Sequence, residues 1–329
     1  MHKSIRKKNG GIIMKKKLVS VLMSAAMAAM LLTGCGSSQD AATETAEKAE
    51  ETTIATEITT AATEVATEET ETVEPFEVTT ITLFAAKSLN TVMEELIAEY
   101  NKTQPNVTIV GSYDSSGTLM AQIEEGAACD VFFSAAQKQM DQLQNEDSLV
   151  VDGTRYNVVN NQVCVVTYKG SGTKVTGLSD MANAGSIALA DGSVPVGKYT
   201  RQAMVNAGML EAADDVSTIT TDTISAALNG VEINECANVG AVTAAVAEGS
   251  NEVGTVYYSD TYGLEDKLEI LEVVPYDLTG NVIYPVAQIQ NSEADDLEKA
   301  AAVDFVNFLT SDQAKTIFQK YYFDTNVEN

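Results

Sequence analysis

The chain of 329 residues carries 47 Asp and Glu against 20 Lys and Arg, a single histidine and no tryptophan. Its formal net charge of −27 argues against nucleic acid as a partner, because phosphate backbones are bound by an excess of Lys and Arg. The single histidine, His2, lies in the leader segment described next. This position excludes catalysis by a Ser-His-Asp triad.

The first segment has the pattern of a secretory signal. Seven Lys and Arg within the first 17 residues precede an apolar run from Leu18 to Leu32. The run is shorter than the ~20 residues that a membrane-spanning helix needs. It stops at Leu32-Thr33-Gly34-Cys35, which resembles a lipobox. The resemblance implies that residues 1–34 are a lipoprotein signal peptide, and that Cys35 becomes a lipidated anchor on the outer side of the cell membrane. Met14 begins a leader of the same type, so the sequence leaves the start open between Met1 and Met14.

Residues 35–77 form the next segment and are expected to be a disordered tether. Beyond Cys35 the composition changes to Thr, Glu and Ala, with twelve acidic residues, one lysine and few large apolar side chains. Such a stretch buries too little apolar surface to offset the entropy lost on ordering. As a random coil it would span ~36 Å.

The rest of the chain, residues 78–329, has 35 Asp and Glu against 12 Lys and Arg, an excess of 23 negative charges. Its three cysteines, Cys129, Cys164 and Cys236, are an odd number without close spacing, which does not indicate a disulfide framework. A Cys-x-x-Cys pair or a histidine cluster is also missing from this sequence, so no direct metal-cation ligands are predicted. Buried small apolar residues are the expected role of these cysteines.

Strand and helix patterns alternate along this part, which indicates an α/β fold with mostly parallel sheets. Apolar residues from Leu89 to Tyr100 recur at helical spacing, directly after a strand and Ser88. A second strand meets Asp114-Ser115-Ser116-Gly117-Thr118, and another short helix follows. The predicted strands are Val78–Ala86, Val107–Tyr113, Asp130–Ser134, Gln162–Tyr168, Ser186–Ala190, Val253–Ser259 and Val282–Ile289, and the last two helices are Asp295–Leu309 and Asp312–Tyr321.

The order of these elements predicts two lobes joined by two hinge strands. Residues 78–163 and 285–329 are assigned to a discontinuous first lobe, and residues 164–284 to the second. Each lobe is expected to hold a mixed, mostly parallel sheet flanked by helices.

Two of the strand-to-helix turns carry a serine, and this pattern favours the binding of an anion. The first N–H groups of a helix lack intrahelical acceptors and lie at the positive end of the dipole, so they bind oxyanions without a cationic side chain. Ser88 and Ser116 each add a hydroxyl. A single serine at such a position is more typical of a helix cap, but two turns facing one cleft would supply about four hydrogen bonds.

Ordered blocks of the sequence resemble the periplasmic molybdate-binding protein family of ABC transporters. The blocks are residues 82–89, 115–127 and 130–135, then Val194-Pro195-Val196-Gly197-Lys198-Tyr199, Gly254-Thr255-Val256-Tyr257-Tyr258-Ser259-Asp260 and Tyr284-Pro285-Val286-Ala287. The resemblance covers nearly all of residues 78–323. It implies a two-lobed type II solute-binding fold that closes on molybdate or tungstate, without a cofactor or an enzymatic activity. It also implies permease and ATPase subunits of an ABC importer as partners.

The resemblance also implies the ligand contacts. They are the hydroxyl and N–H groups of Ser88 and Ser116, the backbone N–H groups of Val196 and Val239, and the hydroxyl of Tyr257. Val196 replaces an alanine of the family, which changes little because the N–H is the relevant group. The match around Val239 is poorer and follows an insertion-like stretch, residues 229–236.

Lys87 is a departure from the family. Its charge beside Ser88 either attracts the anion or faces water.

Two enzyme motifs are incomplete. Residues 192–199 approach a phosphate-binding P-loop, but Tyr199 stands where a Ser or Thr is required. Ser171-Gly172-Thr173-Lys174 matches the Ser-x-x-Lys of serine acylases without the further motifs of those enzymes. The sequence therefore does not predict an enzyme.

Other ligands stay open at this stage. Tyr257 and Tyr258 are similar to the adjacent tyrosinates of ferric-ion receptors of the same fold, although Fe(III) would want further hard ligands. A site made only of donors favours fully ionised molybdate, tungstate or sulfate over protonated phosphate, unless Asp114 points inward and accepts the proton. The sequence does not separate molybdate from tungstate.

Overall fold

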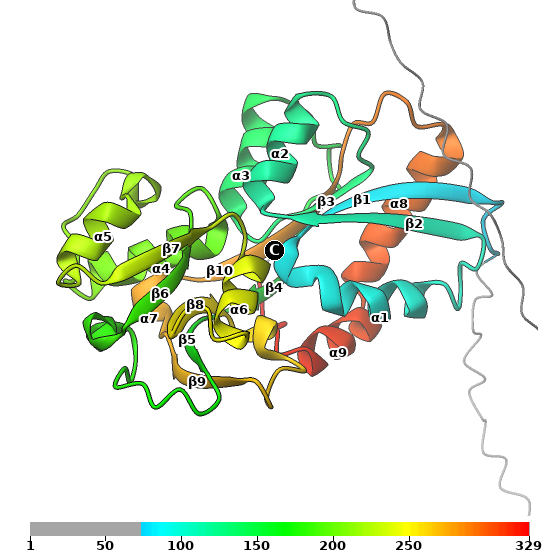
Figure 1. Ribbon diagram of the computed structural model, residues 1–329. Coiled ribbons are helices and arrows are strands. Elements are labelled where there is room, and N and C mark those ends of the chain that lie inside the picture. The colour runs from blue at the N-terminus through cyan, green and yellow to red at the C-terminus, as the bar shows by residue number, and fades with distance from the viewer. Residues whose placement is uncertain (1–73, 329) are drawn as a thin grey trace, which may run out of the picture. The chain divides into compact units, whose positions relative to one another are not determined.

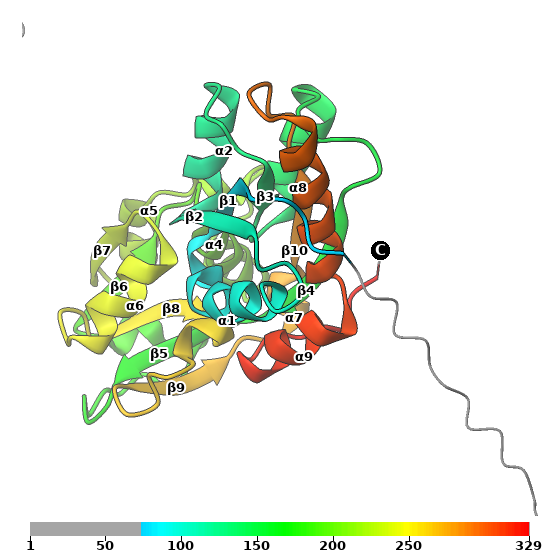
Figure 2. The same cartoon turned by 90° about the vertical axis from the view of Figure 1, so that its right-hand side faces the viewer.

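The computed structural model describes residues 74–328, which contain two five-stranded sheets, each with helices packed beside it (Figures 1 and 2). The two sheets with their helices are called lobe 1 and lobe 2 below. This is the predicted two-lobed α/β architecture. Within residues 74–328 no helix has the length and apolar character needed to cross a bilayer.

The sheet of lobe 1 has the order β2-β1-β3-β10-β4. Its first three strands are parallel, and β10 runs antiparallel to both β3 and β4. The strands are β1 (Thr79–Ala86), β2 (Val107–Asp114), β3 (Val131–Phe133), β4 (Tyr156–Asn161) and β10 (Val282–Gln288). The helices of this lobe are α1 (Asn90–Tyr100), α2 (Ser116–Glu124), α3 (Gln137–Asp141), α8 (Asp296–Leu309) and α9 (Asp312–Lys320), with a 3-10 turn η1 (Lys87–Leu89) and a π-helical turn η2 (Gln142–Glu146).

The sheet of lobe 2 has the order β7-β6-β8-β5-β9. Strand β6 is parallel to β7 and β8, whereas β5 is antiparallel to β8 and β9. The strands are β5 (Val163–Tyr168), β6 (Ser186–Ala190), β7 (Glu232–Cys236), β8 (Val253–Tyr257) and β9 (Leu268–Val273). The helices are α4 (Pro195–Asn206), α5 (Thr221–Ala227), α6 (Val239–Ala247) and α7 (Tyr276–Thr279), with 3-10 turns η3 (Leu178–Asn183), η4 (Val216–Thr218) and η5 (Tyr258–Thr261).

Two connections cross between the lobes. Only Gln162 separates β4 of lobe 1 from β5 of lobe 2, and the return runs from β9 through α7 to β10. Val163 belongs to the sheet of lobe 2, one residue before the predicted start of that lobe. Residues 282–284 belong to the sheet of lobe 1, so this lobe resumes three residues before the predicted limit. The lobe limits themselves, 78–163 with 285–329 and 164–284, stay a prediction.

The parallel strands determine where the helices of interest begin. In a sheet of this kind the turns after the carboxyl ends of neighbouring strands share one edge, and ligands bind in the crevice outside that edge. Strands β1 and β2 lead into η1 and α2, while β6, β7 and β8 lead into α4, α6 and η5. Five helical starts therefore lie at the carboxyl ends of the strands of the two sheets.

Helix α6 packs directly on strand β8 because Gly254 has no side chain. A Cβ atom there would lie 2.8 Å from Val246 Cγ2 and 3.0 Å from the Ala188 carbonyl oxygen. Both neighbouring strands are buried, as expected of apolar runs covered on two faces. The close packing fixes the height of α6 above the sheet.

We expect Gly254→Ala to lower the free energy of unfolding by about 1–3 kcal/mol, because the added methyl group overpacks the contact between α6 and β8. Gly111→Ala on β2 is the control, since its Cβ meets only the side chain of Tyr113, which can move aside. Urea denaturation of both variants measures the effect. Equal stability of the two variants would contradict this account of the packing.

Candidate functional site

A small cavity of about 10 Å³, close to the space of a single water molecule, lies between the two lobes. All five predicted contact residues line it: Ser88 and Ser116 from lobe 1, and Val196, Val239 and Tyr257 from lobe 2. The remaining lining residues are Ala86, Lys87, Ser115, Ala135, Val194 and Pro195. The most distant of these five residues, Ser88 and Tyr257, are 169 positions apart in the sequence, and the fold brings them to the same cavity.

Ser88 lies in the turn η1 between β1 and α1, and it does not cap a helix. The N-cap of η1 is Ala86, and α1 begins only at Asn90. The cap hypothesis for Ser88 is therefore wrong. Its hydroxyl lies instead 2.9 Å from the hydroxyl of Tyr284.

A chain of side chains orients this hydroxyl. Asn161 Nδ2 donates to the Tyr284 hydroxyl at 3.2 Å and to Ser259 Oγ at 2.8 Å. Because the Tyr284 oxygen accepts from Asn161, its hydrogen is free to be donated to Ser88 Oγ, which leaves the Ser88 hydrogen for the cavity. Tyr284 and Asn161 were not among the residues predicted from sequence, because only the tertiary fold brings them beside Ser88.

Ser116 is the first residue of α2, and its neighbour Ser115 is the cap. Ser115 Oγ accepts from the backbone N–H of Thr118 at 3.1 Å. The cap hypothesis for Ser116 is therefore wrong by one residue. Ser116 Oγ accepts from the Ala135 N–H at 2.9 Å, so its own hydrogen is left to donate toward the cavity.

Lobe 2 contributes two helix starts. Pro195 is the first residue of α4 and has no N–H, so Val196 presents the first backbone donor of that helix. Val239 is the first residue of α6, and the preceding Asn238 caps the helix by accepting from the Ala241 N–H at 3.0 Å. Both valine N–H groups belong to a first helical turn and have no acceptor within the helix.

Tyr257 ends strand β8 and is 1 % exposed. Within the described residues its hydroxyl makes no hydrogen bond of good geometry, although the hydroxyl of Tyr284 lies near enough to act on it. Buried polar groups are almost always paired, and an unpaired one costs about 1–3 kcal/mol. Burial also raises the pKa of Tyr257 well above its ordinary value, so the group is a neutral O–H donor that faces the cavity without a partner.

Tyr258 does not share this environment. Its ring stacks on Tyr322 with centroids 4.9 Å apart and an interplanar angle of 15°, and it is not one of the residues that line the cavity. The two adjacent tyrosines thus point to different surroundings.

Asp114 is engaged at the boundary between the lobes. Its Oδ1 accepts from the Ser115 N–H at 2.7 Å and from Asn238 Nδ2 at 3.0 Å. Asn238 belongs to lobe 2, so this contact, together with the ion pair of Lys138 and Asp215 at 3.1 Å, ties the closed lobes together. Asp114 is not among the residues that line the cavity.

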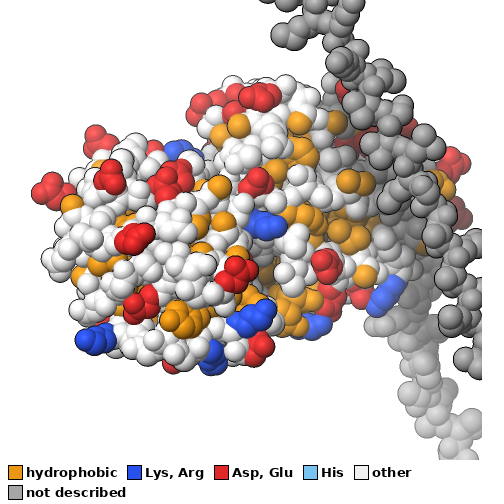
Figure 3. All heavy atoms as spheres, viewed as in Figure 1, with side chains coloured by type: hydrophobic (Ala, Val, Ile, Leu, Met, Phe, Trp, Pro, Cys, Tyr) orange, Lys and Arg blue, Asp and Glu red, His pale blue; other side chains and the backbone are white. Residues whose placement is uncertain are grey.

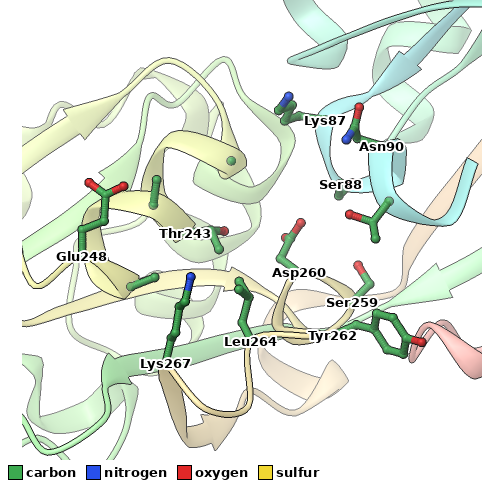
Figure 4. A pocket seen from close by; sticks show the side chains of 14 residues that line it. Lys87, Ser88, Asn90, Thr243, Glu248, Ser259, Asp260, Tyr262, Leu264 and Lys267 are labelled. Atoms are coloured by element: carbon green, nitrogen blue, oxygen red, sulfur yellow. The ribbon is translucent and has the colours of Figure 1, made fainter. Parts of the chain in front are cut away.

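A wider pocket adjoins the cavity through Lys87 and Ser88, which line both. In Figure 4, Lys87, Ser88 and Asn90 come from lobe 1, while Thr243, Asp260 and Lys267 lie on elements of lobe 2. Asp260 is partly buried and accepts from the Tyr257 N–H at 2.9 Å. Burial raises the pKa of its carboxyl to about 7.

Comparisons with known proteins agree with this arrangement. The family described as bacterial extracellular solute-binding protein matches residues 81–324. The chain is 31% identical to the molybdate-binding protein ModA of Escherichia coli over 250 residues, which cover 74% of this chain and 88% of that protein. It is 26% identical over 309 residues to YvgL of Bacillus subtilis, named provisionally as an ABC transporter substrate-binding lipoprotein, with 93% and 98% of the two chains covered.

A solved structure shows the same fold. The periplasmic molybdate-binding protein of Azotobacter vinelandii superposes with a TM-score of 0.60 at 21% identity, covering 74% of this chain and 98% of that one. The family match spans most of the chain, and the fold agrees with it. The chain belongs to the bacterial extracellular solute-binding proteins and is related to the molybdate-binding proteins of ABC transporters.

Proposed function

We propose that this protein captures molybdate or tungstate as a dianion and delivers it to an ABC importer. The ligand would accept from the hydroxyls and N–H groups of Ser88 and Ser116, the N–H groups of Val196 and Val239, and the hydroxyl of Tyr257. The unpaired Tyr257 hydroxyl in a cavity between two lobes is the observation that carries the proposal. An acceptor placed there would remove the cost of leaving that donor buried and unsatisfied.

The number of donors fits tight binding. A hydrogen bond to a charged group contributes about 1.5–3 kcal/mol, and the proposed contacts comprise about seven donors. Micromolar to nanomolar binding needs about 8–12 kcal/mol. The site has enough donors to reach this range after the cost of dehydrating the ion.

The chemistry of the lining favours a fully ionised tetrahedral anion. Protonated phosphate carries an O–H that needs an acceptor, and Asp114, the acceptor considered from the sequence, is not among the residues that line the cavity. Sulfate has the same charge as molybdate and differs in size. We choose molybdate or tungstate over sulfate because relatives across much of the chain are molybdate-binding proteins by name.

Ferric ion is the less favoured ligand. Burial keeps Tyr257 protonated, whereas iron binding requires the tyrosinate. Tyr258, the second ligand of that hypothesis, stacks on Tyr322 instead of facing the cavity.

We further propose that the protein is a lipoprotein of the cell membrane and not an enzyme. The signal peptide 1–34, the lipidated Cys35 and the tether 35–77 lie outside the described residues, apart from 74–77. The name of the Bacillus subtilis relative supports the lipoprotein form. The cavity serines are held by Tyr284 and by the Ala135 N–H, and neither partner is a general base. Permease and ATPase subunits of an importer are the proposed partners.

Calorimetry tests the function. The chain from residue 35 onward, with Cys35→Ala to prevent lipidation, is titrated with molybdate, tungstate, sulfate, phosphate and Fe(III). We expect molybdate and tungstate to bind in the micromolar to nanomolar range and the other ligands to bind more weakly. Absence of binding by both molybdate and tungstate would overturn the proposal.

Tyr257→Phe is expected to weaken molybdate binding by about 1.5–3 kcal/mol while leaving the free energy of unfolding of the ligand-free protein unchanged or higher. The reason is that the hydroxyl is unpaired without a ligand. Tyr258→Phe is the matched control and should keep its affinity for molybdate. If both variants bound molybdate like the parent, the Tyr257 hydroxyl would not contact the ion.

The raised pKa of Asp260, about 7, predicts a pH dependence of binding. Below pH 7 the Asp260 carboxyl is neutral. Above pH 7 it carries a negative charge next to the backbone of Tyr257, and this charge repels the dianion. Molybdate affinity should therefore fall as the pH rises from 6 to 8. Asp260→Asn keeps an acceptor for the Tyr257 N–H and should flatten the profile; an unchanged slope would assign the pH dependence to another group.

Cys35→Ser tests the anchor. The unchanged full-length protein should be found in the membrane fraction of the producing cells, and the variant in the soluble extracytoplasmic fraction or the medium. The reason is that a lipid chain on Cys35 supplies the membrane affinity. Equal membrane association of both proteins would contradict lipidation at Cys35.

A further inference from the structure

Arg201 has the largest side chain that is fully buried in the described part of the chain, with 1 % of its surface exposed. It lies on α4, four residues after Gly197. Its Nη1 donates to the carbonyl oxygens of Ala190 and Gly197, both at 2.9 Å, and its Nε donates to the Ile219 carbonyl at 2.7 Å. All three partners are neutral.

The charge of this guanidinium is not cancelled by a contacting carboxylate. None of the ion pairs formed within residues 74–328 includes Arg201. The carboxylates that act on it from a distance are Asp191 and Glu235, and Asp191 is itself bonded to the N–H and hydroxyl of Ser193. A buried and unpaired charge is costly, and arginine does not shed its proton to avoid the cost.

The guanidinium lies behind the wall of the cavity. Its partners Ala190 and Gly197 lie before and after residues 194–196 in the sequence. Those three residues line the cavity. One helical turn separates Arg201 from Gly197, a rise of about 6 Å. A Cβ atom on Gly197 would lie 2.5 Å from the Ala190 oxygen, so the turn is packed against the strand end and has no room to move away from the charge.

The face of the molecule shown in Figure 3 does not supply this positive charge. On the face shown in Figure 3, acidic side chains are scattered over both lobes and cationic ones are few. Within residues 74–328, Lys87 is the one cationic side chain that lines the cavity, and it also borders the open pocket beside it, where water and salt screen its charge.

We propose that Arg201 is the buried counter-charge of the anion site. It is a positioning residue that does not touch the ion: it holds the first turn of α4 against β6 and supplies a fixed positive potential behind Val196. The site therefore selects doubly charged over singly charged tetrahedral anions, although only neutral groups contact the ligand. This inference rests on the proposed function and goes beyond it by naming what determines the charge selectivity.

A purely structural role for Arg201 makes a different prediction. Loss of the three carbonyl contacts would disturb the first turn of α4 and weaken every anion to the same extent. A Coulomb interaction instead scales with the charge of the ligand. The decrease in affinity for a dianion should then be close to the square of the decrease for a monoanion of the same shape.

The test compares tungstate, a dianion, with perrhenate, a tetrahedral monoanion of similar size. Arg201→Met, Arg201→Lys and the control Thr200→Val are made in the non-lipidated chain from residue 35. Thr200 is buried on the same helix and is bonded to Thr255 through the hydroxyls at 2.9 Å, so its replacement disturbs α4 without removing a charge. Calorimetry gives the tungstate affinity, and displacement of tungstate gives that of perrhenate.

We expect Arg201→Met to weaken tungstate binding ~25-fold and perrhenate binding ~5-fold, as charge scaling requires. Arg201→Lys should recover most of the tungstate affinity, and Thr200→Val should change both affinities by the same factor. Equal losses for the two anions in Arg201→Met, or a lysine variant no better than the methionine variant, would overturn the inference.

A second measurement uses the unaltered site and so does not depend on the folding of a variant. The ratio of tungstate to perrhenate affinity is followed from 0.05 to 1 M sodium chloride. A buried charge is poorly screened, so the ratio should stay within about twofold. A collapse of the ratio would assign the selectivity to exposed cations such as Lys87 and overturn the inference, whereas a parent chain that binds no tungstate would overturn the proposed function itself.

Discussion

Buried hydrogen-bond donors must find acceptors, and this requirement organises the region between the two lobes. The strands of both sheets end at helix starts whose first N–H groups lack partners, and the three hydroxyls of Ser88, Ser116 and Tyr257 reach the same cavity beside the capping Ser115. Two of those hydroxyls are oriented by neighbours, Ser88 by Tyr284 and Ser116 by the Ala135 N–H. The third, on Tyr257, has no partner among the described residues. An oxyanion would satisfy all of these donors at once.

Hydrogen bonds, an ion pair and aromatic contacts join the two lobes. Asp114 bonds to Asn238 across the boundary, Lys138 pairs with Asp215, and Tyr258 stacks on Tyr322. Exposed pairs of this kind are each worth about 0–1 kcal/mol. A ligand that bonds to both lobes would therefore contribute much of the free energy that favours closure.

The sequence predicted the strands with continuous apolar runs and five contact residues that all line the cavity, because local patterns and ordered motifs carry that information. It missed the three edge strands β4, β7 and β9. The residues of β7 are mostly exposed and show no apolar alternation. It left a capping role open for Ser88 and Ser116, and that alternative was wrong. The residue type alone does not decide which of two neighbours, such as Ser115 and Ser116, makes the hydrogen bond of a cap. The roles of Tyr284, Asn161 and Arg201 depend on contacts between distant segments, which no local pattern reveals.

A structure of the molybdate complex, with the metal located by its anomalous scattering, tests the central claim most directly. The account predicts one molybdenum position inside the cavity, with oxide oxygens within hydrogen-bonding distance of Tyr257 Oη, Ser88 Oγ and Ser116 Oγ, and no protein atom bonded to the metal. Molybdenum found outside this cavity, or coordinated directly by a protein side chain, would contradict it.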